Sequence, residues 1–100
     1  MKGWPVTRTM AETQVAPAEV LTWLTLKFAD WLELPVEELE SGRPLSSYGL
    51  DSISAVTLTV QLEEELGIEL ETALLFKRPT LQSLAEHLTE SLNAEGKQLP

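Results

Sequence analysis

One short segment holds the residues best placed for chemistry, a serine that follows a glycine turn and an aspartate. In the run 47–53, Gly49 precedes Asp51 and Ser52, and a stretch rich in helix-forming residues follows. A serine in the first turn of a helix lowers helix propensity and buries nothing, so its presence there calls for a reason. Spacing alone favours the simpler interpretation that Asp51 and Ser52 only cap the helix, because caps prefer these residue types.

Composition excludes most catalytic uses of the Ser52 hydroxyl. The chain has no cysteine and one histidine, His87, so disulfides, thiolate metal sites, cysteine nucleophiles and multi-histidine zinc sites are excluded. The segment around Ser52 offers no activating base, and one histidine at this spacing builds neither a triad nor an oxyanion hole. We therefore expect no catalytic residue and no metal site, and a hydrolase that uses Ser52 is the least favoured function.

Length and charge narrow the class of partner. The chain has 100 residues, enough for one domain, with 43% hydrophobic residues and a formal net charge of −9. Such a surface repels nucleic-acid phosphates and anionic lipids, so we expect no nucleic-acid or membrane binding and a basic protein partner instead. No apolar run is long enough for a membrane span or a signal peptide, and the absence of cysteine suits a cytoplasmic location.

Composition and periodicity divide the chain into three segments. Residues 1–16 show no sustained apolar period and are predicted to be a flexible arm or linker, and residues 93–100 are predicted to be a flexible tail. Residues 17–92 hold four basic and fourteen acidic residues, so a net charge of −10 belongs to the predicted domain. We expect this domain to be monomeric.

Periodicity predicts a first helix, a long connection, a short third helix and a last helix. Pro17 suits a first helical turn, and the helix should stop near Leu34 because Pro35 restricts the residue before it. The connection 35–50 is long for a compact domain, so its apolar residues should pack across the core. Residues 71–76 form the short helix, and Thr80 caps the last. The apolar positions are Val20, Leu24, Phe28 and Leu32, then Val36, Leu39, Leu45 and Tyr48, then Leu81, Leu84, Ala85 and Leu88.

The stretch from Ser52 to Leu66 fits two secondary structures. Its alternating apolar residues and its β-branched residues are typical of a half-buried strand. Against a strand, Leu58, Leu62 and Leu66 repeat every four residues, Asp51 can cap a first turn, and Gly67 can end a helix. We interpret the stretch as a helix. The predicted fold class is all-α, a small antiparallel four-helix bundle with three longer helices, one short third helix and a long first loop.

The run Gly49-Leu50-Asp51-Ser52-Ile53 resembles the Gly-x-Asp-Ser-Leu/Ile signature of acyl carrier proteins. Residues 17–92 as a whole are similar to a carrier domain of modular polyketide synthases, including the Leu34-Pro35 turn and the run 78–81. The resemblance implies that a phosphopantetheinyl transferase attaches 4′-phosphopantetheine from coenzyme A to Ser52. The thiol of that arm would then hold acyl groups as thioesters.

The resemblance also implies how the neighbours of Ser52 take part. A phosphodiester on Ser52 would lie at the positive end of the helix dipole. The charge of Asp51 would repel it, so Asp51 is expected to act in cofactor binding by helping the transferase to position its metal and substrate. Ser54 and Thr57 are neutral, unlike their counterparts in carriers of fatty-acid synthesis. An aspartate before the modified serine, here Asp51, makes the chain less similar to peptidyl carriers. The carriers of polyketide synthases are therefore the type that the chain resembles most.

The helix that begins at Ser52 is predicted to be the main recognition element. Three of its apolar residues lie on a flank that reaches towards Ser52, where an apolar stripe would let partners dock, although core packing explains them equally well. Two of its glutamates would attract basic surfaces, and an ordinary solvated face is the commoner meaning of such a run. The predicted recognition residues are Ile53, Val56, Val60, Glu63 and Glu64.

The expected function is that of an acyl carrier, which is a substrate and shuttle for other enzymes and not an enzyme itself. Expected partners are the transferase, an acyl-loading enzyme (an acyltransferase or an acyl-AMP ligase), and a ketosynthase or other polyketide synthase domains. The alternative function is an unmodified acidic helical adaptor that binds one basic protein.

Overall fold

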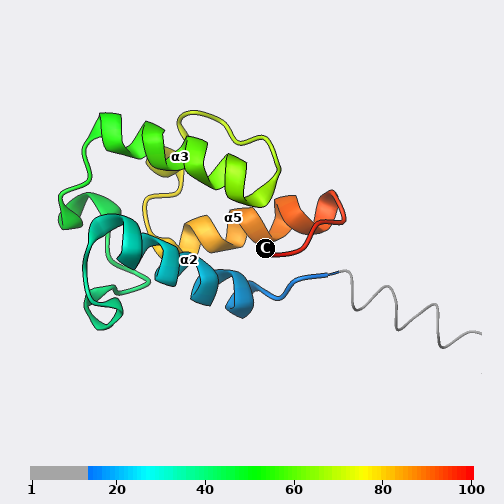
Figure 1. Ribbon diagram of the computed structural model, residues 1–100, viewed down its shortest axis with the longest axis horizontal. Coiled ribbons are helices and arrows are strands. Elements are labelled where there is room, and N and C mark those ends of the chain that lie inside the picture. The colour runs from blue at the N-terminus through cyan, green and yellow to red at the C-terminus, as the bar shows by residue number, and fades with distance from the viewer. Residues whose placement is uncertain (1–13) are drawn as a thin grey trace, which may run out of the picture.

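The computed structural model describes residues 14–100, which fold into a helical bundle (Figure 1). Its elements are α2 (Pro17–Leu32), the 3-10 helices η1 (Val36–Glu38) and η2 (Leu45–Tyr48), α3 (Ser52–Leu66), α4 (Leu74–Lys77) and α5 (Leu81–Ala94). Among these residues, extended pairing is limited to a single bridge between Pro44 and Thr80. The predicted all-α bundle is confirmed, and so is the helical interpretation of the stretch that begins at Ser52. No helix within residues 14–100 is both long and apolar enough to span a membrane.

The core lies between α2, α3 and α5, with α4 packed against α3. The repeats that predicted the three longer helices supply most of it. Because each repeat places apolar residues on one side of its helix, the three apolar faces can be buried against one another. The buried residues include Val20, Leu24 and Phe28 of α2, Leu58, Leu62 and Leu66 of α3, and Leu81, Leu84, Ala85 and Leu88 of α5.

Two helices are shorter than the sequence predicts. α2 ends at Leu32, two residues before the predicted stop, because Glu33 leaves the helix in the left-handed region with a φ of 57°. The N–H of Leu34 then donates to the carbonyl of Ala29 at 2.9 Å, which closes the helix before Pro35 can act. α4 is a single turn of helix that begins at Leu74, since Thr72 and Ala73 form a turn that precedes it.

The long first connection is held against the start of α5. The N–H of Leu45 donates to the carbonyl of Pro79 at 2.8 Å, and the N–H of Gln82 donates to the carbonyl of Ser41 at 2.9 Å. Leu45 is buried, which confirms packing of this loop across the core. Val36 is the exception among the predicted anchors, because η1 lies at the surface and buries none of its residues.

Packed residues lie beyond both predicted edges of the domain. The N–H of Val15 donates to Asn93 Oδ1 at 2.8 Å, and Asn93 Nδ2 donates to the carbonyl of Val15 at 3.1 Å. α5 continues to Ala94, and Leu99 of the predicted tail is half-buried against the core. The rest of the predicted arm, residues 1–13, lies outside the described residues.

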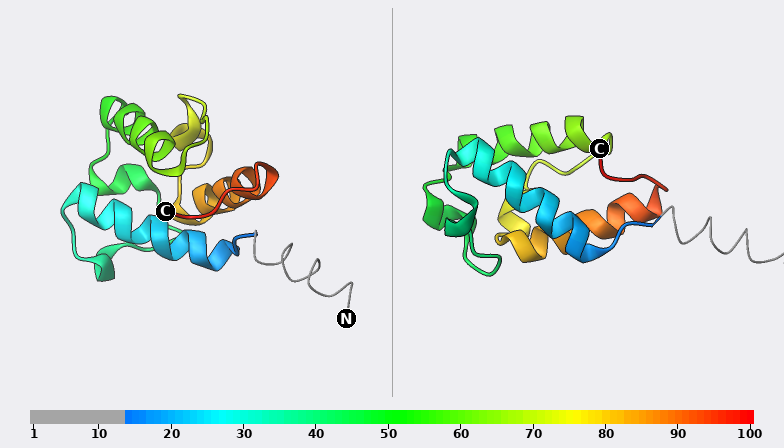
Figure 2. Two further views of the ribbon diagram at one scale, coloured as in Figure 1. Left: turned by 45° about the vertical axis from the view of Figure 1, so that its right-hand side comes forward. Right: turned by 60° about the horizontal axis from the view of Figure 1, so that its bottom comes forward.

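The direction of the helices separates the start of α3 from the start of α2 and the end of α5. The views in Figures 1 and 2 agree that α3 starts at the end of the molecule away from the start of α2 and the end of α5. The two pairs of atoms that join Val15 to Asn93 lie at that second end. The segment that the sequence singled out is therefore at one pole, and the chain enters the bundle at the other.

Candidate functional site

Ser52 is the first residue of α3, and it is exposed. The chain reaches it through Gly49, whose φ of 87° lies in the left-handed region that glycine adopts without strain. No atom lies within 4 Å of the place that a Cβ of Gly49 would occupy, so backbone angle and not crowding requires glycine here. The predicted glycine turn that leads into a helix with a serine at its first position is confirmed.

Asp51 caps α3, as predicted. Its Oδ1 accepts a hydrogen bond from the N–H of Ser54 at 2.8 Å, and its carbonyl accepts one from the N–H of Ala55 at 2.9 Å. The backbone N–H of Ser54, followed by the Ser54 side chain, lowers the pKa of the Asp51 carboxyl below its ordinary value. The carboxylate is therefore ionised at neutral pH, and this capping role is independent of any role in binding a cofactor.

Local polar contacts order the loop that leads to Ser52. The Nε of Arg43 donates to Ser47 Oγ at 2.7 Å, and Ser47 Oγ donates to the carbonyl of Pro44 at 2.6 Å. The Arg43 guanidinium also lies over the ring of Tyr48, 4.5 Å from its centre. The hydroxyl of Tyr48 accepts the N–H of Glu40 at 2.7 Å. Together with the two bonds to the start of α5, these contacts fix where α3 begins.

Two hollows border the start of α3. One, of about 360 Å³, is bounded by η2, α3 and α4, and Ser52 is part of its wall. The other, of about 230 Å³, lies between the end of α2 and α3, and Ile53 is part of its wall. Apolar side chains dominate the first hollow, chiefly Leu45, Leu50, Ala55, Leu75, Phe76 and Pro79.

The three apolar residues predicted for recognition differ in exposure. Ile53 is 80% exposed and Val60 is 45% exposed, whereas Val56 is half-buried. Core packing, the alternative for all three, is therefore wrong for Ile53 and Val60. Ile53 follows Ser52 directly and Val60 lies about two turns further along α3, which is consistent with a docking surface, and their role in recognition stays a prediction.

The two predicted glutamates have different surroundings. Glu63 is half-buried, and its Oε2 accepts the N–H of Leu70 at 2.7 Å, so it holds the loop that follows α3. Glu64 is exposed. The next glutamate, Glu65, pairs with Lys27 of α2 at 3.0 Å. Of the two predicted glutamates, Glu64 is therefore the more accessible to a partner. The contact between Glu63 and Leu70 could not be predicted from helical periodicity, because Leu70 lies in the loop after the helix.

Sequence reasoning missed Phe76, which lies on α4 beside the hollow that contains Ser52. Its side chain is 57% exposed. The sequence predicted a short helix over 71–76 without stating which of its residues are buried, and in α4 these are Leu74 and Leu75. A signal was present in Lys77, directly after Phe76, because a charged residue at the end of so short a helix indicates an exposed last turn. Lys77 pairs with Glu71 at 2.7 Å, which lowers the pKa of the Glu71 carboxyl.

The arrangement suits attachment of an anionic group to Ser52. The hydroxyl is exposed at the N-terminus of a helix of fifteen residues, where the dipole favours negative charge, and the adjoining hollow leaves room for a substituent. Within residues 14–100, His87 lies on α5 and shares no hydrogen bond with Ser52. The same residues contain no group of three or more side chains that could together hold a metal ion. A phosphate ester at Ser52 therefore fits the residues present.

Comparison with known sequences gives a match that includes this site. A family model described as "Phosphopantetheine attachment site" matches residues 22–88. The chain is 32% identical over 84 residues to polyketide synthase PksL of Bacillus subtilis (strain 168). It is 36% identical over 89 residues to one component of the phenolphthiocerol/phthiocerol polyketide synthase of Mycobacterium tuberculosis (strain CDC 1551 / Oshkosh). These matches cover 84% and 89% of this chain but 2% and 4% of those proteins, so the chain corresponds to a small part of each.

Two solved structures share the fold. The HMG-ACPI domain from the CurA module of Lyngbya majuscula has a TM-score of 0.77 and 26% identity, with 83% of this chain and 84% of that chain covered. A free-standing peptidyl carrier protein from Acinetobacter baumannii has a TM-score of 0.69 and 33% identity, with 76% and 95% covered. The bundle with its long first loop is therefore an arrangement already seen in carrier domains.

Proposed function

Because this chain belongs to the phosphopantetheine attachment-site family, we propose that it is an acyl carrier domain of polyketide biosynthesis whose 4′-phosphopantetheine arm is attached to Ser52. The family match over residues 22–88 supports 4′-phosphopantetheine as the attached group, and the position of Ser52 at the start of α3 supports Ser52 as the attachment residue. The observation that carries the assignment is an exposed hydroxyl at the first position of α3, inside the matched region. When bound, the group supplies a thiol that carries acyl chains as thioesters.

The residues around Ser52 hold and orient the attachment point. Ser52 Oγ would form the phosphoester, and the N-terminus of α3 stabilises the negative charge of the phosphate. Asp51 keeps the first turn formed through its bond to Ser54. Its own negative charge opposes the phosphate, so we assign its further role to the loading reaction, in which it would help the transferase to position its metal and substrate. The base that takes the Ser52 proton would belong to the transferase.

The flank of α3 beside Ser52 is the surface proposed for partner recognition. Any enzyme that reaches an arm on Ser52 comes close to Ile53, the next residue, and Val60 continues the exposed apolar surface along α3. Val56 and Glu64 lie on the same helix, and Glu64 would attract a basic rim on the partner. The partners would be the transferase, an acyl-loading enzyme and a ketosynthase or other polyketide synthase domain. Their binding would be transient, because a carrier must leave each enzyme.

The chain itself would act as a substrate and shuttle in the cytoplasm and not as an enzyme. Catalysis in each step would belong to the partner that binds the arm. Carrier domains are typically non-catalytic, and the reducing cytoplasm suits a chain without cysteine.

Loading with coenzyme A tests the attachment residue. The full chain is incubated with coenzyme A and a broad-specificity phosphopantetheinyl transferase, and intact masses are compared for the wild type, Ser52→Ala and Ser46→Ala. Ser46 is a matched control, since it is an exposed serine in the wall of the same hollow. We expect the wild type and Ser46→Ala to gain one phosphopantetheine group and Ser52→Ala to gain none. A gain in Ser52→Ala would exclude Ser52 as the attachment point, and no gain in the wild type would favour the unmodified adaptor.

The loaded chain also tests the recognition flank. Ile53→Ser should leave loading complete but slow acyl transfer from the loading enzyme by roughly tenfold in kcat/KM, since an exposed apolar contact beside the arm is lost. Val36→Ser is the matched control, because Val36 is an exposed apolar residue on η1. Equal transfer by Ile53→Ser and the wild type would remove Ile53 from the recognition surface.

A further inference from the structure

α2 carries an exposed apolar patch that the carrier function does not use. Leu26 is 55% exposed, and it lines a shallow hollow of about 490 Å³ on the outer side of α2. We define the α2 patch as Leu26 with Ala18, Thr22 and Trp23. None of these residues lines either hollow at the start of α3. The patch is therefore a second surface, separate from the attachment point.

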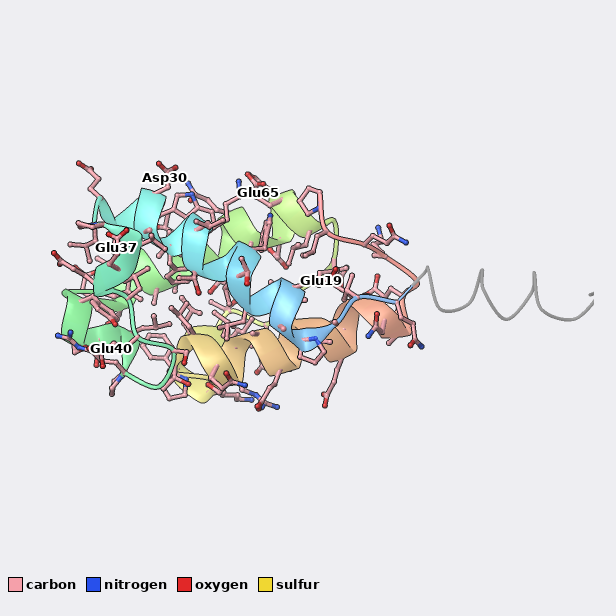
Figure 3. The ribbon with its side chains drawn as sticks, turned by 90° about the horizontal axis from the view of Figure 1, so that it is seen from below. Glu19, Asp30, Glu37, Glu40 and Glu65 are labelled. Carbon is pink, nitrogen blue, oxygen red and sulfur yellow. The ribbon has the colours of Figure 1, made fainter. Side chains whose placement is uncertain are left out.

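Carboxylates border the α2 patch along the helix. Glu19 precedes Leu26 by seven residues and Asp30 follows it by four, spacings that place all three on one side of α2. Figure 3 looks onto α2 and shows Glu19 and Asp30 towards opposite ends of the helix, with Glu65 of α3 at its flank. Glu19 and Asp30 are eleven positions apart, which corresponds to about 16 Å along the helix. Both carboxylates are exposed.

The basic residue of α2 does not neutralise this border. Lys27 Nζ pairs with Glu65 Oε1 of α3 at 3.0 Å and lies 5.7 Å from the centre of the Trp23 ring. Its charge is thus directed to Glu65 and to the ring of Trp23, and not to Glu19 or Asp30. The surface of α2 therefore has an apolar centre between two acidic ends, and its charge is complementary to that of a basic amphipathic partner.

We propose that the α2 patch docks a protein surface that has an apolar side chain at its centre and two cations about 16 Å apart. Leu26 and Trp23 contact the apolar group, and Glu19 and Asp30 pair with the cations. A basic amphipathic helix meets this description, since positions eleven residues apart lie on one side of a helix. The α2 patch and the hollows at Ser52 share no residue, but Asp30 is followed directly by Trp31, which lines the hollow beside Ile53. The inference does not depend on modification of Ser52.

Charge disfavours a second copy of this chain as the occupant. A symmetric dimer through the α2 patch would place the same acidic border on both sides of the interface. Like charges would then face one another, which opposes association. The first thirteen residues, which include Lys2 and Arg8, are the other candidate occupant, and the experiment below distinguishes them.

A synthetic peptide provides the test. The probe is a helical peptide of leucine and lysine with its leucines on one side and two lysines eleven residues apart, and it is titrated into the full chain labelled with ¹⁵N. The largest amide shifts are expected between Glu19 and Asp30. Leu26→Ser should weaken binding at least tenfold, and Glu19→Gln with Asp30→Asn should weaken it and reduce its dependence on salt. Val60→Ser is the matched control, because Val60 is an exposed valine on α3, and it should bind the peptide like the wild type.

Several outcomes would overturn the proposal. Shifts centred on α3, or unchanged affinity for Leu26→Ser, would show that the peptide does not use the α2 patch. Self-association of the wild type that Leu26→Ser abolishes, measured by sedimentation, would assign the patch to a second copy. Tighter peptide binding after Lys2→Gln with Arg8→Gln would assign it to the chain's own N-terminal residues. Mass gain with coenzyme A is measured on the same variants and should be complete in Leu26→Ser, so failure of this proposal is distinguishable from failure of the carrier assignment.

Discussion

Asp51 and Ser52 are adjacent residues with different roles at the start of α3. The carboxylate of Asp51 accepts the N–H of Ser54, which is one of the helix's unpaired donors, whereas Ser52 stays exposed. Since Asp51 supplies the cap, the Ser52 hydroxyl is not needed for that bond. A hydroxyl that is free of capping can be modified without loss of the first turn of α3.

The lowered pKa of Asp51 predicts how its contribution changes with pH. The carboxyl has a lower pKa in the folded chain, so its ionised form stabilises the fold above the unfolded pKa, near 4. That stabilisation is lost as the pH falls through the folded pKa. Asp51→Asn keeps a capping side chain but cannot titrate. We expect the wild type to exceed Asp51→Asn in free energy of unfolding near pH 6, and the difference to decrease as the pH falls below about 4.

Urea denaturation of both proteins across this range measures the difference, and the other carboxylates cancel because both proteins share them. A difference that stays constant with pH would mean that the charge of Asp51 does not stabilise α3.

At the residue scale, the site was predictable where its contacts are local. Gly49, Asp51 and Ser52 lie within four residues of one another, so turn and capping preferences reach all of them. The bond from Leu70 to Glu63 crosses a loop, and the exposure of Phe76 depends on how α4 sits against α3. Neither follows from local preference, because tertiary packing decides both.

At the scale of elements, the ends of α2 and α3 use the same backbone conformation with different residues. Glu33 ends α2 with a φ of 57°, and Gly67 ends α3 with a φ of 67°. Glycine adopts this region freely, whereas a residue with a Cβ is strained there by about 1–2 kcal/mol. α2 therefore ends at a residue that its backbone disfavours.

Exchanging residues at these two ends should change stability in opposite directions. Glu33→Gly should raise the free energy of unfolding by up to about 1 kcal/mol, because strain is relieved while the unfolded chain gains some entropy. Gly67→Ala should lower it by roughly 1–2 kcal/mol, since an alanine there is strained. Urea denaturation measures both, with Gly42→Ala as a control at a glycine that has a negative φ and no atom within 4 Å of its Cβ position. Changes of one sign in both variants would contradict this account.

The start and end of α3 were predictable because a cap, a repeat every four residues and a glycine agree. The end of α2 was not, because Pro35 suggested a stop at Leu34 and nothing in the sequence marks Glu33 as a left-handed residue. The all-α class followed from the same repeats. Which loop residues are buried depended on contacts with α5, as the buried Leu45 and the exposed Val36 illustrate.

At the scale of the whole molecule, a pair of hydrogen bonds joins the residue that precedes α2 to the end of α5, at the pole opposite Ser52. Asn93 of α5 donates to and accepts from the backbone of Val15, 78 residues earlier in the chain. Sequence periodicity cannot reveal a contact at this separation. The predicted domain edges therefore stopped short of residues that the fold includes.

Removing this pair should loosen the entry of the chain without altering the site. Asn93→Ala should lower the free energy of unfolding by about 1–2 kcal/mol, since two hydrogen bonds are lost. Hydrogen exchange at the N–H of Val15 should become faster. Gln82→Ala on the same helix is the control, because its side-chain bond to Glu86 is exposed and of little consequence. Unchanged exchange at Val15 in Asn93→Ala would show that the Asn93 side chain does not hold this end.

The position of the Val15–Asn93 contact determines how the molecule can be immobilised on a surface. The chain enters the bundle at the pole opposite the start of α3. A sensor chip or bead that is coupled ahead of Val15 therefore holds the molecule at the pole away from Ser52. The exposed Ser52 then lies at the end of the bundle that is away from the coupled surface. Anchoring in this orientation leaves Ser52 accessible, so loading of the arm and its visits to partner enzymes can be recorded on the coupled protein.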